Sequence, residues 1–230
     1  PMPTDTPAAT VLLSGGLDST VLLHHVACRL RRRPVYALSF RYGQRHRREL
    51  AMARWQAAAA GAEVRHAVLS IPCLAALAGD GSALVGGGPE IPDLAALSPD
   101  ERRQPPTYVP NRNLILLALA GAFAEAHGCQ ELYYGAQAQD EYGYWDCTAE
   151  FVARLNATLA LNRRTPVHVL APFVGWRKAE IVRLGIELGV DFARTWSCYR
   201  GGRRPCGTCP TCVERQRAFR EAGHPDPWER

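Results

Sequence analysis

The chain has 230 residues, of which 47% are hydrophobic and 21% charged, and its formal net charge is +5. This balance is typical of a globular domain with a substantial core and excludes a disordered chain. No apolar run reaches the ~18 residues that cross a bilayer, and the acidic, proline-rich start is unlike a signal peptide, so we expect a cytoplasmic protein without membrane contact. Of the 27 basic residues only Lys178 is a lysine. The arginine-rich stretches therefore reflect a bias of the whole chain, and direct nucleic-acid binding is disfavoured.

Apolar runs and helical patterns alternate along the chain. The apolar runs predict β-strands at residues 9–13, 35–40, 64–69, 131–136 and 167–173. The other patterns predict helices at residues 48–60, 113–127, 150–162 and 178–188, besides a helix that opens near residue 17. This alternation indicates an α/β fold with a Rossmann-like, doubly wound parallel sheet that binds ligands at the carboxyl ends of its strands. We expect residues 1–190 to form this domain, with an irregular Gly- and Pro-rich insertion at 71–106.

A glycine-rich loop follows the first predicted strand. After Leu13 the chain reads Ser14-Gly15-Gly16-Leu17-Asp18-Ser19-Thr20 and continues into a helix. The two glycines let the backbone approach an anion closely, and the N–H groups at the start of the helix then face that anion. The hydroxyl groups of Ser14, Ser19 and Thr20 add donors, and Asp18 is placed to cap the helix or reach a metal. We therefore predict a phosphate-binding loop over residues 13–20.

Two other kinds of phosphate loop do not fit this segment. The Walker motif requires a lysine, which the segment lacks, and the dinucleotide fingerprint requires a third glycine where Ser19 stands. The segment instead resembles the pyrophosphate loop of enzymes that cleave ATP between its α and β phosphates to give AMP and pyrophosphate. A hydroxyl-rich helix start is unusual for a plain glycine turn. ATP is therefore the expected ligand of the loop.

Four of the eight cysteines lie close together near the end of the chain. They are Cys198, Cys206, Cys209 and Cys212, and Gly207 and Pro210 permit tight turns between them. Clustered cysteines in a chain expected to be cytoplasmic indicate metal binding before disulfides. Four thiolates suit a tetrahedral structural Zn²⁺ site, and we expect residues 191–230 to form a small C-terminal zinc-binding lobe. An iron–sulfur cluster uses the same Cys-x2-Cys-x2-Cys spacing and stays open as the alternative.

Further segments, taken in order, carry a family resemblance. They are Phe40-Arg41-Tyr42-Gly43-Gln44-Arg45-His46, Tyr108-Val109-Pro110-Asn111-Arg112-Asn113, Tyr144-Trp145-Asp146-Cys147, Lys178-Ala179-Glu180-Ile181, Thr195-Trp196-Ser197-Cys198-Tyr199 and Asp226-Pro227. Together with the loop and the four cysteines, they resemble the 7-cyano-7-deazaguanine synthase family of queuosine-precursor biosynthesis. The resemblance runs from about Val11 to Pro227. It implies the adenine-nucleotide alpha hydrolase-like fold of the pyrophosphate-loop ATPases.

The resemblance implies an AMP-forming carbon–nitrogen ligase. In that family ATP adenylates the carboxylate of 7-carboxy-7-deazaguanine, ammonia displaces AMP to give an amide, and a second adenylation permits dehydration to the nitrile. Mg²⁺ and a cation from the protein would stabilise the departing pyrophosphate. The residues expected to act are Asp18, Arg112 and Lys178 in catalysis, the loop from Leu13 to Thr20 on ATP, Asp140 on Mg²⁺ or the ribose, and Tyr42, Tyr144 and Asp146 on the substrate.

Several positions depart from the family pattern. The family usually has Gly where Asn111 stands and Gly-Val-Asn-Ala at residues 135–138, and its Pro and Arg become Trp145 and Thr148. These changes gather around the expected base pocket, so other activities stay open. One is a ligase that stops at the amide or uses another amine, including one on a protein. A thiolase or amidotransferase that shares the loop is a second, and a non-enzymatic module that binds RNA or protein is a third. The sequence also permits a homodimer.

Overall fold

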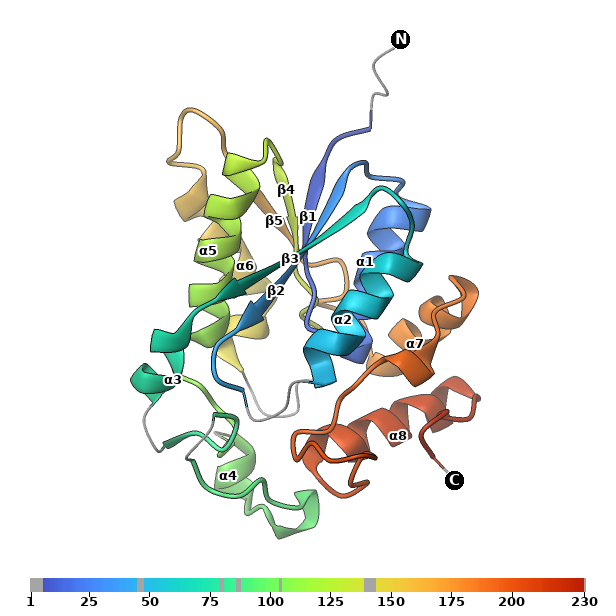
Figure 1. Ribbon diagram of the computed structural model, residues 1–230. Helices are drawn as coiled ribbons and strands as arrows, with labels where there is room; N and C mark the ends of the chain where they lie inside the picture. The colour runs from blue at the N-terminus through green and yellow to red at the C-terminus, as the bar shows by residue number, and fades with distance from the viewer. Residues whose placement is uncertain are drawn as a thin grey trace.

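The computed structural model describes residues 6–44, 48–78, 81–85, 88–103, 105–138 and 144–229. Its strands form a five-stranded sheet at the centre of the molecule (Figure 1). They are β1 (Ala9–Leu12), β2 (Val35–Arg41), β3 (Val64–Ser70), β4 (Glu131–Tyr133) and β5 (His168–Leu170), in the order β3-β2-β1-β4-β5. Each of these pairings is parallel, so the carboxyl ends of the strands meet at one edge. The strand order reverses between β1 and β4, which makes that junction the switch point of the sheet.

Helices cover both faces of the sheet (Figure 1). The α-helices that the structure describes are α1 (Leu17–His24), α2 (Arg48–Ala59), α3 (Pro72–Ala78), α4 (Pro99–Arg103), α5 (Arg112–Ala126), α6 (Ala149–Leu159), α7 (Lys178–Glu187) and α8 (Pro210–Ala222). Shorter helical turns are η1 (His25–Arg29), η3 (Leu94–Ala96), η4 (Trp145–Cys147) and η5 (Phe192–Arg194). Helices α1, α2 and α7 cover one face, and α5 and α6 cover the other. This arrangement confirms the doubly wound α/β fold.

An apolar layer fills the space between each face of the sheet and its helices. Ala37 of β2 belongs to the layer under α1 and α7, whereas Leu38 belongs to the layer under α5 and α6. Successive side chains of a strand point to opposite faces, so one buried strand supplies both layers. Phe219 of α8 lies in the first layer with Ile181 of α7. Helix α8 therefore shares the core that lies between the sheet and its helices.

The predicted strands are all present, but two of them end early. β4 stops at Tyr133 and β5 at Leu170, while the apolar runs continue to Ala136 and Phe173. Tyr134, Ala136 and Phe173 are buried in the loops that follow these strands. The segment at 71–106 contains α3, η3 and α4, so it is partly helical rather than irregular throughout. In the described part of the chain, each helix is too short or too polar to cross a membrane.

Candidate functional site

The loops after β1 and β4 meet at the switch point. The predicted phosphate loop begins at Leu13, directly after β1, and residues 135–137 follow β4. A Cβ added to Gly135 would lie 3.6 Å from the backbone of Ser19, so the second loop packs closely on the start of α1. Ligands of doubly wound sheets bind in the crevice at this point. The predicted loop thus lies where the fold favours a ligand.

Gly15 and Gly16 shape the loop. The φ of Gly15 is +87°, and a Cβ there would collide with the carbonyl oxygen of Glu49 in the first turn of α2. Only glycine permits this conformation and this backbone-to-backbone contact together. Gly16 is the N-cap of α1, and its N–H group donates to the Ser14 hydroxyl at 3.2 Å. The loop is therefore held against α2 while the start of α1 points towards the crevice.

The hydroxyl groups of the loop separate into two sets. The Ser14 and Ser19 hydroxyls lie 2.9 Å apart, and the Ser14 N–H group donates to Ser19 Oγ at 3.1 Å. Both serines line the crevice. Thr20 is fully buried and is not part of the cavity lining. Its side chain faces the core, so the hydroxyl donors available to a ligand are those of the two serines.

Two adjoining cavities occupy the crevice, with volumes of about 280 Å³ and about 170 Å³. Both are lined by Ser14, Gly16, Asp18, Glu49 and Tyr199. The larger cavity also takes in Leu13, Tyr42, Arg112, Gln137 and Cys147, and the smaller one takes in Leu17, Tyr144, Lys178 and Glu214. Concave sites of this size, with a few converging polar groups, are typical of small-molecule binding.

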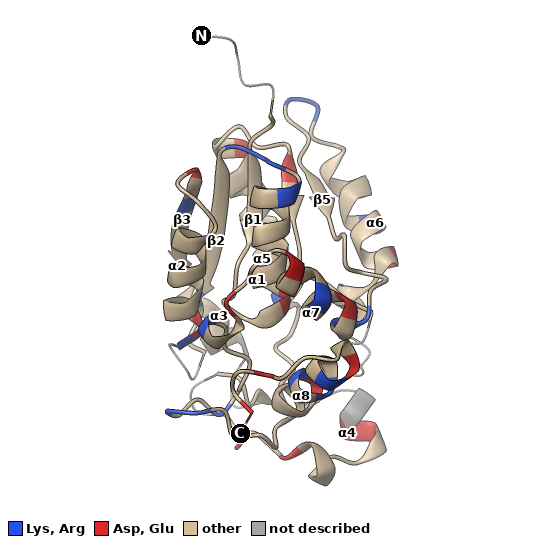
Figure 2. Ribbon diagram, turned by 90° about the vertical axis from the view of Figure 1, so that its right-hand side faces the viewer, with Lys and Arg blue, Asp and Glu red and all other residues tan. Residues whose placement is uncertain are grey.

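Lys178 is the first residue of α7 and lies between two carboxylates. Its Nζ is 2.9 Å from Oε2 of Glu214 and 3.8 Å from Oδ2 of Asp18. The lysine side chain is 12% exposed, so water screens these ion pairs less than it screens exposed charges. Both basic and acidic residues occur along α7 and α8 (Figure 2). Lys178 is thus part of the wall of the smaller cavity, beside the phosphate loop.

Arg112 begins α5 and provides a cation in the wall of the larger cavity. Burial lowers its pKa, but the neighbouring phenol groups of Tyr42 and Tyr199 outweigh that effect, and the net result is a raised pKa. Burial also raises the pKa of Tyr42, against the opposing charge of Arg112. The guanidinium therefore stays charged and the phenol stays neutral at physiological pH.

The other substrate residues expected from the sequence are divided between the cavity and the core. The Tyr144 hydroxyl lies 3.2 Å from that of Thr107 at the smaller cavity. Asp146 is 2% exposed, is not part of the cavity lining, and accepts a hydrogen bond from the Asn113 N–H at 3.3 Å. Burial raises its pKa, against the Arg112 charge and the Asn113 donor. This geometry favours a helix-capping role for Asp146 over contact with a purine edge. Asp140 lies outside the described residues.

The departures from the family pattern have local structural explanations. Asn111 has φ +53°, in the left-handed region that Gly adopts freely and Asn tolerates best among the other residues. Thr148 is the N-cap of α6 and accepts from the Phe151 N–H at 3.1 Å. Trp145 is 45% exposed and does not line either cavity, whereas Gln137 does. Of the replaced positions that the structure describes, Asn111, Trp145 and Thr148 thus lie off the cavity wall, whereas Ala136 and Gln137 line the larger cavity.

The four clustered cysteines present a site suited to a metal ion. Their sulfur atoms all lie within 4.8 Å of one another. Cys198, Cys209 and Cys212 are buried, and Cys206 is partly buried. The Cys206 N–H points to the sulfur of Cys198 at 3.4 Å, and the Cys209 N–H to that of Cys206 at 3.3 Å. Such donors stabilise thiolates, the form of cysteine that binds metals.

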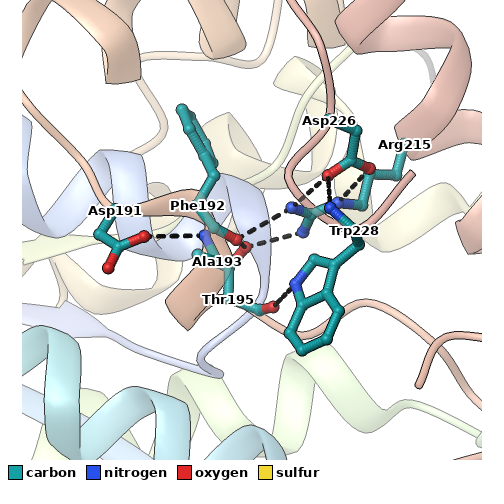
Figure 3. A network of polar contacts seen from close by, with 7 residues as sticks. All are labelled: Asp191, Phe192, Ala193, Thr195, Arg215, Asp226 and Trp228. Carbon is teal, nitrogen blue, oxygen red and sulfur yellow. Dashed lines mark hydrogen bonds and ion pairs between the residues drawn. The ribbon is translucent and has the colours of Figure 1, made fainter. Parts of the chain in front are cut away.

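A buried ion pair joins α8 and the segment after it to the segment before the cysteines (Figure 3). Arg215 of α8 donates to both carboxylate oxygens of Asp226, at 2.8 and 3.0 Å. It also donates to Thr195 Oγ1 at 2.7 Å and to the carbonyl oxygen of Phe192 at 3.0 Å. The indole N–H of Trp228 donates to the Thr195 carbonyl at 3.2 Å. These contacts fix the position of the backbone at Thr195.

The next residue links this network to the phosphate loop. The Trp196 N–H donates to the carbonyl oxygen of Gly15 at 2.9 Å, and its indole N–H donates to the Cys198 carbonyl at 2.8 Å. Trp196 is fully buried. The loop, the Arg215 network and the cysteine cluster are therefore joined through one short segment of chain.

Sequence reasoning missed three residues of the site: Glu49, Tyr199 and Glu214. Glu214 lies in α8, which was not predicted as a helix. A signal for α8 exists, because Pro210 stands at its first turn and Gly223, with φ +78°, follows its last residue. Tyr199 is the last residue of a quoted motif and Glu49 follows another by three residues, but only the folded chain brings them to the loop.

Comparison with known proteins identifies the family. A family model described as queuosine biosynthesis protein QueC matches residues 8–223. The chain belongs to the QueC family. It is 44% identical to the 7-cyano-7-deazaguanine synthase of Archaeoglobus fulgidus, over 95% of this chain and 88% of that protein. It is 43% identical to the enzyme of the same name from Cupriavidus pinatubonensis, over 96% of this chain and 97% of that protein. These relatives support an enzyme with a queuosine-type synthase function.

Solved structures of two other proteins share the fold of this QueC family member. The tRNA thiolase NcsA of Methanococcus maripaludis, with its 4Fe–4S cluster, matches with TM-score 0.50 and 15% identity, over 80% of this chain and 57% of that one. The NMN synthetase of Francisella tularensis matches with TM-score 0.50 and 14% identity, over 97% of this chain and 80% of that one. At these identities the likeness establishes the fold alone, and it agrees with the α/β fold expected from the sequence.

Proposed function

We propose that the chain is a cytoplasmic, ATP-dependent ligase that converts 7-carboxy-7-deazaguanine and ammonia, through the amide, to 7-cyano-7-deazaguanine. AMP and pyrophosphate are the other products, and the reaction needs only small-molecule substrates. Family membership supports the acid and the nitrile, because relatives with the synthase name match nearly the whole chain. The observation that carries the ATP-dependent step is the loop from Ser14 to Ser19, which lies at the start of α1 in the walls of both cavities.

The site suits adenylation for electrostatic reasons. Ammonia does not displace oxide from a carboxylate, whereas AMP is a good leaving group. The pyrophosphate released from ATP concentrates negative charge, which the N–H groups at the start of α1 and the Ser14 and Ser19 hydroxyls can bind. We propose that Lys178 and Arg112 neutralise charge that develops on the phosphates. Mg²⁺ would accompany the triphosphate as its counterion, with Asp140 as a proposed ligand of the ion or the ribose.

The placement of the departing residues supports the nitrile as product over an amide or a conjugate with another amine. Thr148, which stands where the family has Arg, caps α6. Trp145, which stands where the family has Pro, lies off the cavity lining. Asn111 keeps the backbone conformation that a glycine would adopt. These changes therefore leave most of the cavity wall unaltered.

We propose that the four cysteines bind one structural Zn²⁺ within a lobe formed by residues 191–230. Tetrahedral zinc with Zn–S bonds of about 2.3 Å holds its thiolates about 3.8 Å apart. The sulfurs of Cys206 and Cys212 lie 3.9 Å apart. An iron–sulfur cluster inserts several atoms between its cysteines and would hold them farther apart. The observed spacing thus supports zinc, whose chemistry here is to cross-link the lobe.

The proposed reaction is tested by its nucleotide products. Incubation of the protein with 7-carboxy-7-deazaguanine, ATP, Mg²⁺ and ammonia is expected to yield AMP and pyrophosphate, with the amide and then the nitrile detected by mass spectrometry. The physical reason is that the loop presents its donors to a pyrophosphate group and lacks the Walker lysine. ADP and orthophosphate as products would contradict the proposal.

Lys178→Ala is expected to lower the rate of acid-dependent pyrophosphate release about 10²-fold. The ammonium lies 3.8 Å from the Asp18 carboxylate of the loop, and a point charge of this kind stabilises charge that develops on phosphate. Lys178→Arg should recover part of the rate, because its planar fork cannot take the same place between Asp18 and Glu214.

The matched control is Arg177→Ala, which removes an exposed cation one residue earlier. The rate of this control should equal that of the wild type. Thermal unfolding of each variant separates loss of rate from loss of fold. If the folded Lys178→Ala variant releases pyrophosphate at the wild-type rate, Arg112 is the cation that stabilises charge on the phosphates.

A further inference from the structure

Glu49 occupies the junction of the two cavities. It lies in the first turn of α2, where its backbone contacts Gly15 of the phosphate loop. Glu49 is part of the wall of both the larger and the smaller cavity. The contact with Gly15 fixes the start of α2 next to the loop, and the Glu49 carboxyl group interacts electrostatically with Arg112 in the wall of the larger cavity. The QueC resemblance gives this residue no role.

The other titratable groups of the larger cavity are already engaged. Asp18 forms an ion pair with Lys178. The Tyr134 hydroxyl donates to the Asp146 carbonyl at 3.1 Å, and the sulfur of Cys147 lies 3.3 Å from the same hydroxyl. No histidine lines either cavity among the described residues. Glu49 forms no ion pair or hydrogen bond through its side chain to another residue that the structure describes.

The surroundings of Glu49 bring the pKa of its carboxyl group close to neutral pH. Burial raises the pKa of Glu49 to about 8, and the positive charge of Arg112 opposes part of that rise. A group with a pKa near the working pH is an effective general base, because it is partly ionised and still basic. Burial keeps the pKa of neighbouring Tyr199 well above its usual value, so that phenol stays neutral.

We propose that the Glu49 carboxylate accepts the proton that ammonia loses as it attacks the adenylated acid, an inference that rests on the proposed function. The nitrogen lone pair forms the C–N bond at the acyl carbon, and the C–O bond to AMP breaks with its electron pair leaving on AMP. The nitrogen of the adduct is positively charged until one N–H proton passes to Glu49. The carboxylic acid then returns this proton to water, so carboxylate, amide and AMP are the species that remain.

The pH dependence follows from the ionised form that is required. The base must be deprotonated, so the rate of amide formation per molecule of free ammonia should rise with pH through about 8 and then level off. The charged groups that line the two cavities with Glu49 are Asp18 of α1, Arg112 of α5, Lys178 of α7, and Glu214 and Arg215 of α8. The other titratable groups there are the phenols of Tyr42, Tyr134, Tyr144 and Tyr199 and the thiol of Cys147. Of these, Arg112 is the one that acts on the pKa of Glu49.

The test compares two half-reactions in Glu49→Gln. Exchange of labelled pyrophosphate into ATP, in the presence of the acid and without ammonia, measures adenylation alone and should stay within about twofold of the wild type. Amide formation should fall about 10²-fold and lose its rise near pH 8. Glu63→Gln, which changes an exposed glutamate after the other end of α2, is the matched control and should alter neither rate. Glu49→Asp keeps a carboxylate and should retain a rise with pH at a reduced rate.

Hydroxylamine provides a readout that a structural role would not change. Its adduct is much more acidic than that of ammonia and loses its proton to water without a base. Glu49→Gln should therefore form the hydroxamate at nearly the wild-type rate while it forms the amide slowly. Equal losses with both amines, an unchanged amide rate, or loss of exchange together with amide formation would each overturn the role of Glu49. Absence of exchange in the wild type would instead overturn the proposed function.

Discussion

Cys209→Ser is expected to release the bound metal and unfold the C-terminal lobe. A serine hydroxyl is a poor ligand compared with a thiolate, and a structural zinc site contributes a binding free energy on the order of 10 kcal/mol. Loss of a substantial part of that energy is comparable with the whole stability of a typical domain, about 5–15 kcal/mol. Elemental analysis of the purified protein and its thermal unfolding, with and without a chelator, measure the two effects.

The matched control is Cys73→Ser, since Cys73 is an exposed cysteine outside the cluster. This variant should keep its metal and its unfolding temperature. Retention of one zinc per chain by all four single variants of the clustered cysteines would show that they do not form the site. Iron in the elemental analysis, together with a visible absorption band, would show that the cysteines bind an iron–sulfur cluster instead of zinc.

The fold and the place of the glycine-rich loop in it were predictable because their signals are local. Each buried strand is a short apolar run, and α5 and α7 are each followed by a glycine with positive φ, Gly128 and Gly189. The loop is one contiguous segment, and glycine is the only residue type that fits at position 15. The four cysteines likewise lie within fifteen residues, so their spacing alone indicated a metal site.

The rest of the site depends on contacts between distant parts of the chain. Glu49 comes from α2, Arg112 from α5 and Glu214 from α8, and no local pattern sets their separation in space. α8 escaped prediction because its sequence is polar and the cysteine turns precede it directly. Asp146 shows how a contact outside its motif bears on a role: the motif predicts a substrate ligand, and in the fold its carboxylate accepts a hydrogen bond from the Asn113 N–H in the first turn of α5. A motif identifies which residues matter more readily than it identifies what each one contacts.

Arg215→Met is expected to lower the free energy of unfolding by about 3–5 kcal/mol. The side chains of Arg215 and Asp226 are 4% and 2% exposed, so removal of the arginine leaves a buried carboxylate without its cation. The network also fixes Thr195, next to the Trp196 N–H that supports Gly15. ATP affinity should therefore fall as well. Chemical denaturation and nucleotide binding at a temperature where the variant stays folded measure the two effects.

Arg217→Met is the matched control, two residues further along α8. Arg217 pairs with Glu221, but their side chains are 53% and 33% exposed, and such a pair contributes no more than ~1 kcal/mol. The double change Arg215→Met with Asp226→Leu should recover much of the lost stability, because it removes both buried charges together. It should not recover ATP affinity, since Thr195 still lacks the guanidinium donor. If Arg215→Met proves no less stable than Arg217→Met, the ion pair does not hold the lobe to the phosphate loop.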